Sequence, residues 1–324
     1  MPPPATRRRR PRRLNRHPPL PVVIDCDPGT DDALALLLAF ASPELEVRAI
    51  TVAGGNVGLD RTLPNALALV ALAGVDVPVH AGADRPLLGA FVNEVRVHGA
   101  DGLAGVALPA GGAAQAEQAA DAIRRHLRTT AAPLTLVGIG PATNLALALA
   151  TEPALAARVA RIVLMTGAWG EGNATPAAEF NAYNDPEALA ILLGCGRPVV
   201  LAPLDLTSQA MATPARLAAL RAGGSGRALA TAAAIQAGVP PSRRLGGDGA
   251  PLHDPCAIAW LLRPALFTAR QAAVSVDLGP GPCRGRTVID RWGRTGAPPN
   301  ALVLETLDAD GVFALLRERL ARLP

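Results

Sequence analysis

Four aspartates lie within eight residues near the start of the chain. They are Asp25, Asp27, Asp31 and Asp32. The apolar run Val22 to Ile24 precedes them, a helix is expected from about Thr30, and the Pro28-Gly29 pair demands a tight turn. Such a turn brings the acids together, and like charges held close need either protonation or a cation. Because a hard divalent ion is the natural partner of carboxylates, we predict a metal or catalytic site here.

A purely structural interpretation explains only part of this segment. Thr30 would cap the helix, and Asp31 and Asp32 would complement the helix dipole. That interpretation leaves Asp25 and Asp27 without a role. We therefore favour a metal or catalytic role for the four acids as a group.

A second acidic position lies far along the chain, at Leu252-His253-Asp254-Pro255. An aspartate before a proline at the start of an apolar helix, here Cys256 to Leu262, is a common N-cap arrangement. Taken alone, the segment is best interpreted as a helix cap. The neighbouring His253 makes it a candidate part of the same site only when it is considered together with the first acids.

A third segment, Glu171 to Asn181, follows a strand expected to end at Met165. It places Asn173, Glu179 and Asn181 along one loop. Carboxamides and carboxylates of this kind bind hydroxyl groups, although a solvated loop would carry them equally well. The sequence alone leaves both interpretations open.

The charge distribution argues against a nucleic-acid partner. The chain has 324 residues and a pI near 9.3, but seven of its 31 basic residues lie in the acid-free tail from Met1 to His17. The remainder is mildly acidic, so we expect residues 1–19 to be a disordered Arg/Pro-rich appendage and nucleic-acid binding to be unlikely. The longest apolar stretches, such as Ala33 to Ala41, are too short to span a bilayer, so no membrane association is expected.

Residue usage excludes several kinds of chemistry. The chain contains no lysine, so neither a Schiff-base enzyme nor a P-loop phosphate clamp works in its usual form. The four cysteines form no C-x-x-C pair, which argues against a zinc knuckle or a redox motif. A reducing compartment, the cytoplasm, fits this cysteine usage best.

From Leu20 onward, short β-branched or apolar runs alternate with longer Ala/Leu-rich runs, which is the rhythm of an α/β fold. The expected strands are Pro21 to Asp25, Glu46 to Val52, Val77 to His80, Pro133 to Ile139, Arg161 to Met165 and Arg197 to Ala202. Three further runs toward the C-terminus extend the sheet, with antiparallel pairing expected, before a closing helix. These are Ala272 to Leu278, Arg286 to Asp290, Ala301 to Thr306 and the helix Ala309 to Leu323. We predict one domain over residues 20–324, an open, mostly parallel, Rossmann-like sheet flanked by helices, with ligands bound beyond the carboxyl ends of the strands.

Taken in order, these segments resemble the inosine-uridine-preferring nucleoside hydrolase family. The family's opening pattern D-x-D-P-G-x-D-D stands here as Asp25 to Asp32, and the resemblance runs from about Pro21 to the C-terminus. Further matching segments are Val52 to Asn56, Val97 to Leu103, Gly138 to Asn144, Glu179 to Asn181, Asp185 to Ala188 and Gly281 to Thr287. Together they are far more specific than any one of them alone.

The resemblance implies a calcium-dependent hydrolase that cleaves the N-glycosidic bond of ribonucleosides, and a homodimer or homotetramer. Calcium would be held by Asp27, Asp32, the backbone carbonyl of Ile139 and Asp254. The ribose would be held by Asp31, Asn56, Asn173, Glu179 and Asn181, with Met165 packing nearby. His98 and His253 would line the base pocket. Asp27 would act as general base on the attacking water, and His253 is our candidate proton donor to the leaving base.

Three alternatives remain at this stage. A haloacid-dehalogenase-like phosphatase also opens with D-x-D but normally needs a phosphate-binding lysine. A nucleoside phosphorylase would share the substrate but require phosphate, and an inactive ribose-binding relative should have lost ligand acids. The preferred base is open, because the segment Gly238 to Leu252 contains no aromatic residue and instead carries Arg243 and Arg244.

Overall fold

The computed structural model describes residues 18–242 and 245–324. Most of the expected N-terminal appendage, together with Arg243 and Arg244, lies outside these described residues. Within them, no helix has the length and apolar character needed to cross a membrane.

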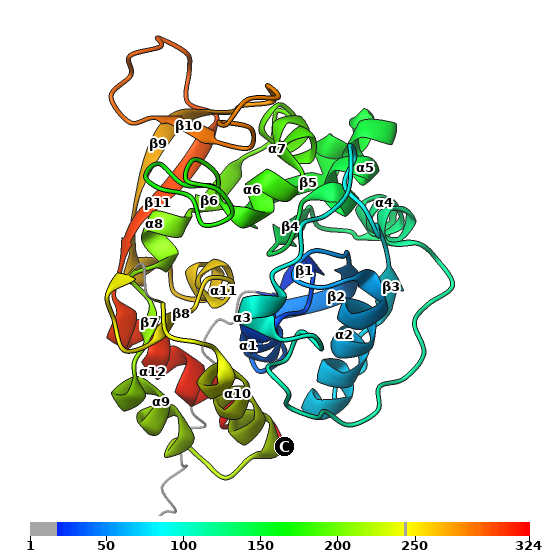
Figure 1. The fold of residues 1–324 in the computed structure, drawn as a ribbon. Helices are drawn as coiled ribbons and strands as arrows, with labels where there is room; N and C mark the ends of the chain where they lie inside the picture. Colours follow the sequence, from blue (N-terminus) through cyan, green and yellow to red (C-terminus); the bar gives the residue numbers. More distant parts are fainter. Residues whose placement is uncertain (1–17, 243–244) are drawn as a thin grey trace, which may run out of the picture.

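A nine-stranded sheet crosses the described part of the chain in the order β10-β9-β11-β6-β5-β4-β1-β2-β3 (Figure 1). Its strands are β1 (Leu20–Cys26), β2 (Leu45–Val52), β3 (Val79–Ala81), β4 (Leu134–Gly138), β5 (Val159–Met165), β6 (Val199–Ala202), β9 (Phe267–Val276), β10 (Thr287–Asp290) and β11 (Ala301–Leu307). A separate two-stranded antiparallel sheet pairs β7 (Met211–Ala212) with β8 (Ala250–Pro251). All six strands expected in the first part of the chain are therefore present, with boundaries shifted by a few residues.

The first six strands are parallel and follow the doubly wound order 3-2-1-4-5-6. In this arrangement the chain reverses its winding between β1 and β4, which leaves a crevice beyond the carboxyl ends of those two strands. β1 leads directly into Asp27, and β4 leads into Ile139. The topology alone therefore brings two segments more than a hundred residues apart to the same edge of the sheet.

The C-terminal strands extend the sheet through antiparallel pairs, as expected, but with different bounds. β9 pairs antiparallel with β10 and β11, whereas β11 runs parallel to β6. β9 begins at Phe267, five residues before the predicted start, because its first half is polar and exposed and so lacks an apolar run. Its pairing with β11 forms this half of the strand without the help of burial.

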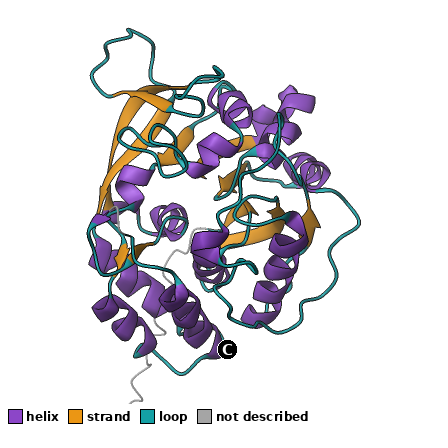
Figure 2. Cartoon of the chain, viewed as in Figure 1, coloured by secondary structure: helices purple, strands orange, loops and turns teal. Residues whose placement is uncertain are grey.

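Helices cover both faces of the sheet (Figure 2). They are α1 (Thr30–Phe40), α2 (Leu59–Ala73), α3 (Val95–His98), α4 (Ala119–Thr129), α5 (Thr143–Thr151), α6 (Phe180–Asn184), α7 (Pro186–Leu193), α8 (Leu204–Thr207), α9 (Pro214–Arg221), α10 (Arg227–Gly238), α11 (Pro255–Leu262) and α12 (Ala309–Leu320), with short 3-10 turns η1 (Pro153–Arg158) and η3 (Pro264–Leu266). Successive β1 residues alternate between two hydrophobic cores, Val22 and Ile24 in one and Val23 in the other. One core holds α1, α2, α10, α11 and α12, and the other holds α4, α5 and α7.

Helix α1 is the central element for the site. Its residues from Thr30 to Ala39 are all buried, so it is enclosed on every side rather than amphipathic. It packs against α11, whose first residues follow His253 and Asp254. This packing joins the first acidic segment to the second.

Candidate active site

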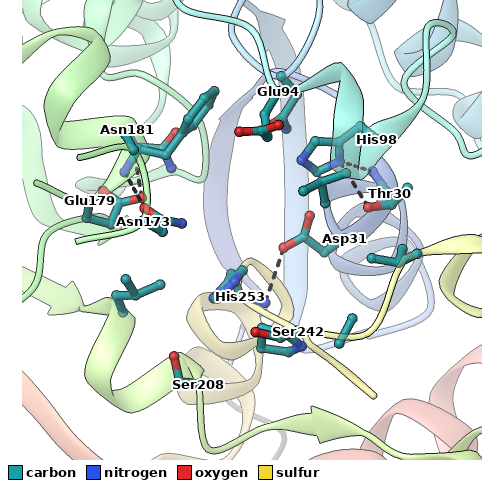
Figure 3. Close-up of a pocket in the computed structure, with 18 of the residues that line it drawn as sticks. Thr30, Asp31, Glu94, His98, Asn173, Glu179, Asn181, Ser208, Ser242 and His253 are labelled. Atoms are coloured by element: carbon teal, nitrogen blue, oxygen red, sulfur yellow. Dashed lines mark hydrogen bonds between the residues drawn. The ribbon is translucent and has the colours of Figure 1, made fainter. Parts of the chain in front are cut away.

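A cavity of about 1120 Å³ lies at the carboxyl ends of the parallel strands. Figure 3 shows Asp31, His98, Asn173, Glu179, Asn181 and His253 arranged around it. All of the predicted site residues line the cavity except Asp27 and Asp32, which are fully buried next to it. The three segments considered separately in the sequence therefore form one site.

The turn between β1 and α1 is held together by the side chain of Asp32. Its carboxylate accepts hydrogen bonds from the backbone N–H groups of Gly29 (3.0 Å) and Asp27 (3.2 Å) and from the Asn56 amide (3.0 Å). The N-cap residue is Gly29, and no side-chain capping hydrogen bond is present, so the structural alternative in which Thr30 caps the helix is wrong. Asp32 does stabilise the helix start, which was the structural interpretation of this residue, but it also faces the other acids.

Asp27 is held by close backbone on two sides. A Cβ atom on Gly55 would lie 2.1 Å from its Oδ2, and one on Gly140 would lie 2.3 Å from its Oδ1. Oδ2 accepts a hydrogen bond from the backbone N–H of Asn56 at 2.7 Å. Oδ1 is buried and has no hydrogen-bond partner among the described residues. An unpartnered buried carboxylate oxygen is costly, which indicates that another group satisfies it in the working protein.

Asp31 connects the first acidic segment to the second. Its Oδ2 accepts the backbone N–H of His253 at 3.2 Å and that of Asp254 at 3.4 Å. Asp254 stands at the N-cap position of α11, as the helix-cap interpretation predicts, but its side chain makes no capping hydrogen bond. Carboxylate oxygens of Asp31, Asp32 and Asp254 instead lie within 4.8 Å of one another. We call Asp27, Asp31, Asp32 and Asp254 the acid cluster.

Burial and mutual repulsion raise the proton affinity of the acid cluster. Burial first, and then the charge of Asp31, raises the pKa of Asp32 to about 7. Burial and the neighbouring acids hold the pKa values of Asp27 and Asp254 well above their ordinary range. A bound divalent cation would remove this repulsion, because it favours the charged form of every carboxylate around it.

The residues present fit a hard metal ion. The unpartnered Oδ1 of Asp27, the three close carboxylates and the Ile139 carbonyl are all oxygen donors, which is the ligand set that calcium and magnesium prefer. The Ile139 carbonyl accepts one hydrogen bond, from the Asn181 amide at 3.0 Å, and its second lone pair remains. The site can therefore hold a metal ion.

The Glu171 to Asn181 loop is fixed by the same polar groups that line the cavity. Buried Glu179 accepts backbone N–H groups of Gly167, Asn181 and Ala182, while burial raises its pKa. The Asn181 amide donates to the carbonyls of Ile139 and Met165, and the Asn173 side chain accepts the backbone N–H of Phe180. Buried hydrogen bonds therefore hold the loop in a defined conformation, so it is not simply a solvated loop.

Each cavity histidine is oriented through its Nδ1 atom by a threonine. The backbone N–H of Thr30 donates to Nδ1 of His98 at 3.1 Å, so this nitrogen carries no proton and the neutral ring carries one on Nε2. Burial lowers the pKa of His98, which favours this neutral form. Nδ1 of His253 lies 2.7 Å from the hydroxyl of Thr207, at the end of α8.

Sequence reasoning did not single out several residues that shape the site. Gly55 and Gly140 allow the close approach to Asp27, and Thr207 orients His253. Thr51 and Asn144, which donate hydrogen bonds to Asp25, were not singled out either, and burial raises the pKa of Asp25 to about 7. The glycines were visible as Gly54-Gly55-Asn56 and Gly138-Ile139-Gly140 after strands, but no sequence pattern signals Thr207.

Comparisons with known proteins agree with this site. The family described as "Inosine-uridine preferring nucleoside hydrolase" matches residues 22–314. The chain belongs to this family. It is a ribonucleoside hydrolase, a glycosidase that splits the N-glycosidic bond, so the phosphatase and inactive-relative alternatives are set aside.

Individual relatives differ in the base they are named for. The chain is 46% identical over 305 residues to the pyrimidine-specific ribonucleoside hydrolase RihA of Salmonella schwarzengrund, covering 93% of this chain and 98% of the relative. Among solved structures it is similar to a plant nucleoside hydrolase, PpNRh1 (34% identity, TM-score 0.86, 94% and 99% coverage). It is also similar to a purine-preferring ribonucleoside hydrolase from Gardnerella vaginalis (30% identity, TM-score 0.85, 93% and 98% coverage).

Proposed function

We propose that this protein is a calcium-dependent hydrolase of pyrimidine ribonucleosides, with Asp27 as the general base. The proposal rests on the buried Oδ1 of Asp27, which has no partner among the described residues, and on the neighbouring carboxylates of Asp31, Asp32 and Asp254, which lie within 4.8 Å of one another. Such an arrangement is stable in its charged form only with a cation. The ligands would be Asp27, Asp32, Asp254 and the carbonyl of Ile139.

Calcium is the proposed ion because every ligand is an oxygen and the ligands come from separate segments. Calcium accepts six to eight oxygens in flexible geometry, whereas magnesium demands a near-ideal octahedron. The bound ion would supply Lewis acidity and a fixed attachment point for the ribose hydroxyls. Asp31, Asn56, Asn173, Glu179 and Asn181, around Met165, would hold the sugar.

The chain's own side chains would perform the proton transfers. Asp27 takes a proton from the attacking water. Positive charge develops on the ribose ring as the bond breaks, and the acid cluster stabilises it. His253, oriented by Thr207, donates a proton to the departing base, and His98 offers its Nε2–H to the base or sugar.

A pyrimidine preference is supported by two observations. The 46% identical relative is named as pyrimidine-specific, whereas the purine-preferring solved structure is only 30% identical. In addition, the described cavity-lining residues from position 236 to 251 include no aromatic side chain. A large purine ring system would therefore find no stacking partner on this side of the cavity.

The direct test is release of free ribose from uridine, cytidine, inosine and adenosine, with and without a calcium chelator. We expect the pyrimidine ribonucleosides to react fastest, without added phosphate, and chelation to abolish release until calcium is restored. Release that is insensitive to chelation would contradict the metal proposal. Faster release from inosine than from uridine would contradict the pyrimidine preference.

Three further features are part of the proposal. We propose residues 20–324 as one catalytic domain, so a chain lacking residues 1–19 should keep its kcat/KM. The four free cysteines support a reducing compartment, the cytoplasm.

The proposed homodimer or homotetramer is supported by two large apolar side chains at or next to the edge strand β10. Trp292 is 80% exposed and Val288 is 48% exposed. Light scattering measures the oligomeric state.

A further inference from the structure

Gln236 lines the cavity, and its side-chain amide has no hydrogen-bond partner among the described residues. Its residue is only 2% exposed, and both the amide nitrogen and the amide oxygen lack a partner. It lies in the last turn of α10. Of all the polar side chains in the cavity wall, it alone has both a donor and an acceptor group buried and unpaired in the described structure.

Such an amide is expensive unless a ligand satisfies it. A buried amide that makes no hydrogen bond loses the interactions it had with water, and a methionine or leucine of similar size would avoid that loss. Buried polar groups without partners in a native protein therefore call for an explanation. A ligand bound in the cavity supplies one when the Gln236 side chain turns toward it from its buried position.

The position of Gln236 is also rigid. Its helical neighbours Ala232, Ala233 and Ile235 are fully buried, and α10 packs against α1, the helix that carries Asp31 and Asp32. A group fixed on a packed helix is positioned more accurately than a group on a loop. The backbone that carries the Gln236 side chain is therefore held at a defined place relative to the acid cluster.

The cavity wall beside Gln236 is otherwise almost entirely apolar. From position 236 to 251 the described lining residues are Gln236, Val239, Pro240, Pro241, Ser242, Leu245, Ala250 and Pro251. Aliphatic and proline side chains accept a flat base but do not distinguish one hydrogen-bonding edge from another. Any such discrimination on this wall falls to Gln236 and Ser242.

We propose that Gln236 reads the hydrogen-bonding edge of the base, as a specificity-determining residue for the reaction. This inference rests on the proposed function and names the substrate class more closely: pyrimidines with an adjacent donor and acceptor at N3 and C4. With uracil, the amide oxygen accepts N3–H and the amide N–H donates to O4. With cytosine, the amide rotates by half a turn, so that its N–H donates to N3 and its oxygen accepts the C4 amino group. A glutamine thus serves both pyrimidines.

The test compares substrates that differ only at this edge. Uridine has the edge, 3-methyluridine has a methyl group in place of the N3 proton, and 4-nitrophenyl β-D-ribofuranoside has the ribose with a leaving group that carries no such edge. In Gln236→Met, we expect the ratio of kcat/KM for uridine to that for the nitrophenyl riboside to fall about 30-fold. The preference of the wild-type protein for uridine over 3-methyluridine should largely disappear in the variant.

Two controls separate specificity from folding. Gln271→Met makes the same chemical change at an exposed position of β9 and should leave the substrate ratios at their wild-type values. Thermal unfolding of Gln236→Met should show a midpoint at or above that of the wild type, since an unpaired buried amide is removed.

Two results would overturn the inference. An equal loss on all three substrates would show a structural role for Gln236, and unchanged ratios would show no contact with the base. Failure of the proposed function gives a different pattern, because wild-type protein would then release nitrophenol from the riboside but no ribose from uridine or cytidine. That result would refute both the pyrimidine preference and the role of Gln236.

Discussion

At the scale of single residues, the chemistry depends on how Asp27 is held. Its Oδ2 is fixed by the Asn56 backbone, and its Oδ1 is the one carboxylate oxygen of the acid cluster found both buried and unpartnered in the described structure. In the proposed mechanism this carboxylate both coordinates calcium and takes a proton from water. The two tasks are compatible because a carboxylate has two oxygens with four lone-pair positions.

Replacement of Asp27 by asparagine tests the general base. The side-chain carbonyl introduced by Asp27→Asn would still accept the Asn56 N–H, so the fold should persist, but an amide cannot take a proton from water. We expect kcat for uridine to fall by about 10³-fold or more, while the protein stays folded. Circular dichroism and ribose release measure the two quantities. Turnover near the wild-type value would refute the assignment.

Gly140→Ala tests whether close approach to Asp27 matters. A Cβ atom at position 140 would lie 2.3 Å from Oδ1 of Asp27, so the carboxylate must move. Because misplacing a catalytic group by about 1 Å costs about 10²-fold, we expect kcat to fall by about that factor. The matched control is Gly112→Ala, since a Cβ there meets nothing within 4 Å. Equal activity in the two variants would show that the site tolerates the shift.

The types of the site residues were predictable, but their contacts were not. Crowded acids around Pro28-Gly29 indicate a cation because like charges repel at any detailed geometry. Asp254 was ambiguous because Asp-Pro is also a helix-cap pattern, and only the spatial meeting with Asp31 resolves it. Thr207 and Gln236 were not predictable, since a threonine or a glutamine on a helix gives no signal until the fold places it against the cavity.

At the scale of elements, the strands that were predicted well are buried ones, because a buried strand has a continuous apolar run that can be recognised in the sequence. β1 and β4 are buried along most of their length, and their predicted bounds differ from the observed ones by one residue. β9 was predicted only in part, because its exposed first half is stabilised by pairing with β11 and not by a hydrophobic face. Pairing between distant segments leaves no local pattern, so such boundaries cannot be derived from the sequence alone.

A buried histidine in helix α4 predicts that the stability of the protein depends on pH. His126 is buried in this helix, its Nε2 has no partner among the described residues, and burial together with the nearby charges of Arg125 and Arg48 lowers its pKa to about 4. The folded-state pKa thus lies below the unfolded value of about 6.5. The neutral ring therefore contributes stability above pH 6.5, and this contribution is lost as the pH falls toward 4.

Urea unfolding of wild type and His126→Leu at about pH 7.5 and about pH 4.5 measures this effect. Between the two pH values we expect the wild type to lose about 1 kcal/mol more free energy of unfolding than the variant, which has no ring to protonate. The comparison uses the change with pH, so any packing difference of leucine cancels. Parallel losses in the two proteins would contradict the lowered pKa.

At the scale of the whole molecule, the acid cluster joins distant parts of the chain. Asp27 and Asp32 come from the β1–α1 turn, Ile139 follows β4, and Asp254 precedes α11. A cation bound by all of them links the first strand of the sheet to a helix near the C-terminal end. Metal binding and global stability are therefore coupled, since the ion binds the folded chain and not the separated segments.

Chelation should consequently destabilise the entire fold. The variant Asp254→Asn should separate the loss of the bound ion from the repulsion among the acids. Calcium at about a hundred times its Kd adds about 2.7 kcal/mol to the free energy of unfolding, which raises Tm by several degrees. Without calcium, repulsion among buried Asp31, Asp32 and Asp254 opposes folding, so the chelated variant should melt above the chelated wild type. With calcium, the variant has lost a ligand and should gain less in Tm than the wild type does.

Exposed Asp76→Asn is the matched control and should follow the wild type in both conditions. A calcium-induced gain in Asp254→Asn equal to that of the wild type would exclude Asp254 as a ligand, because removing repulsion alone cannot preserve the metal response.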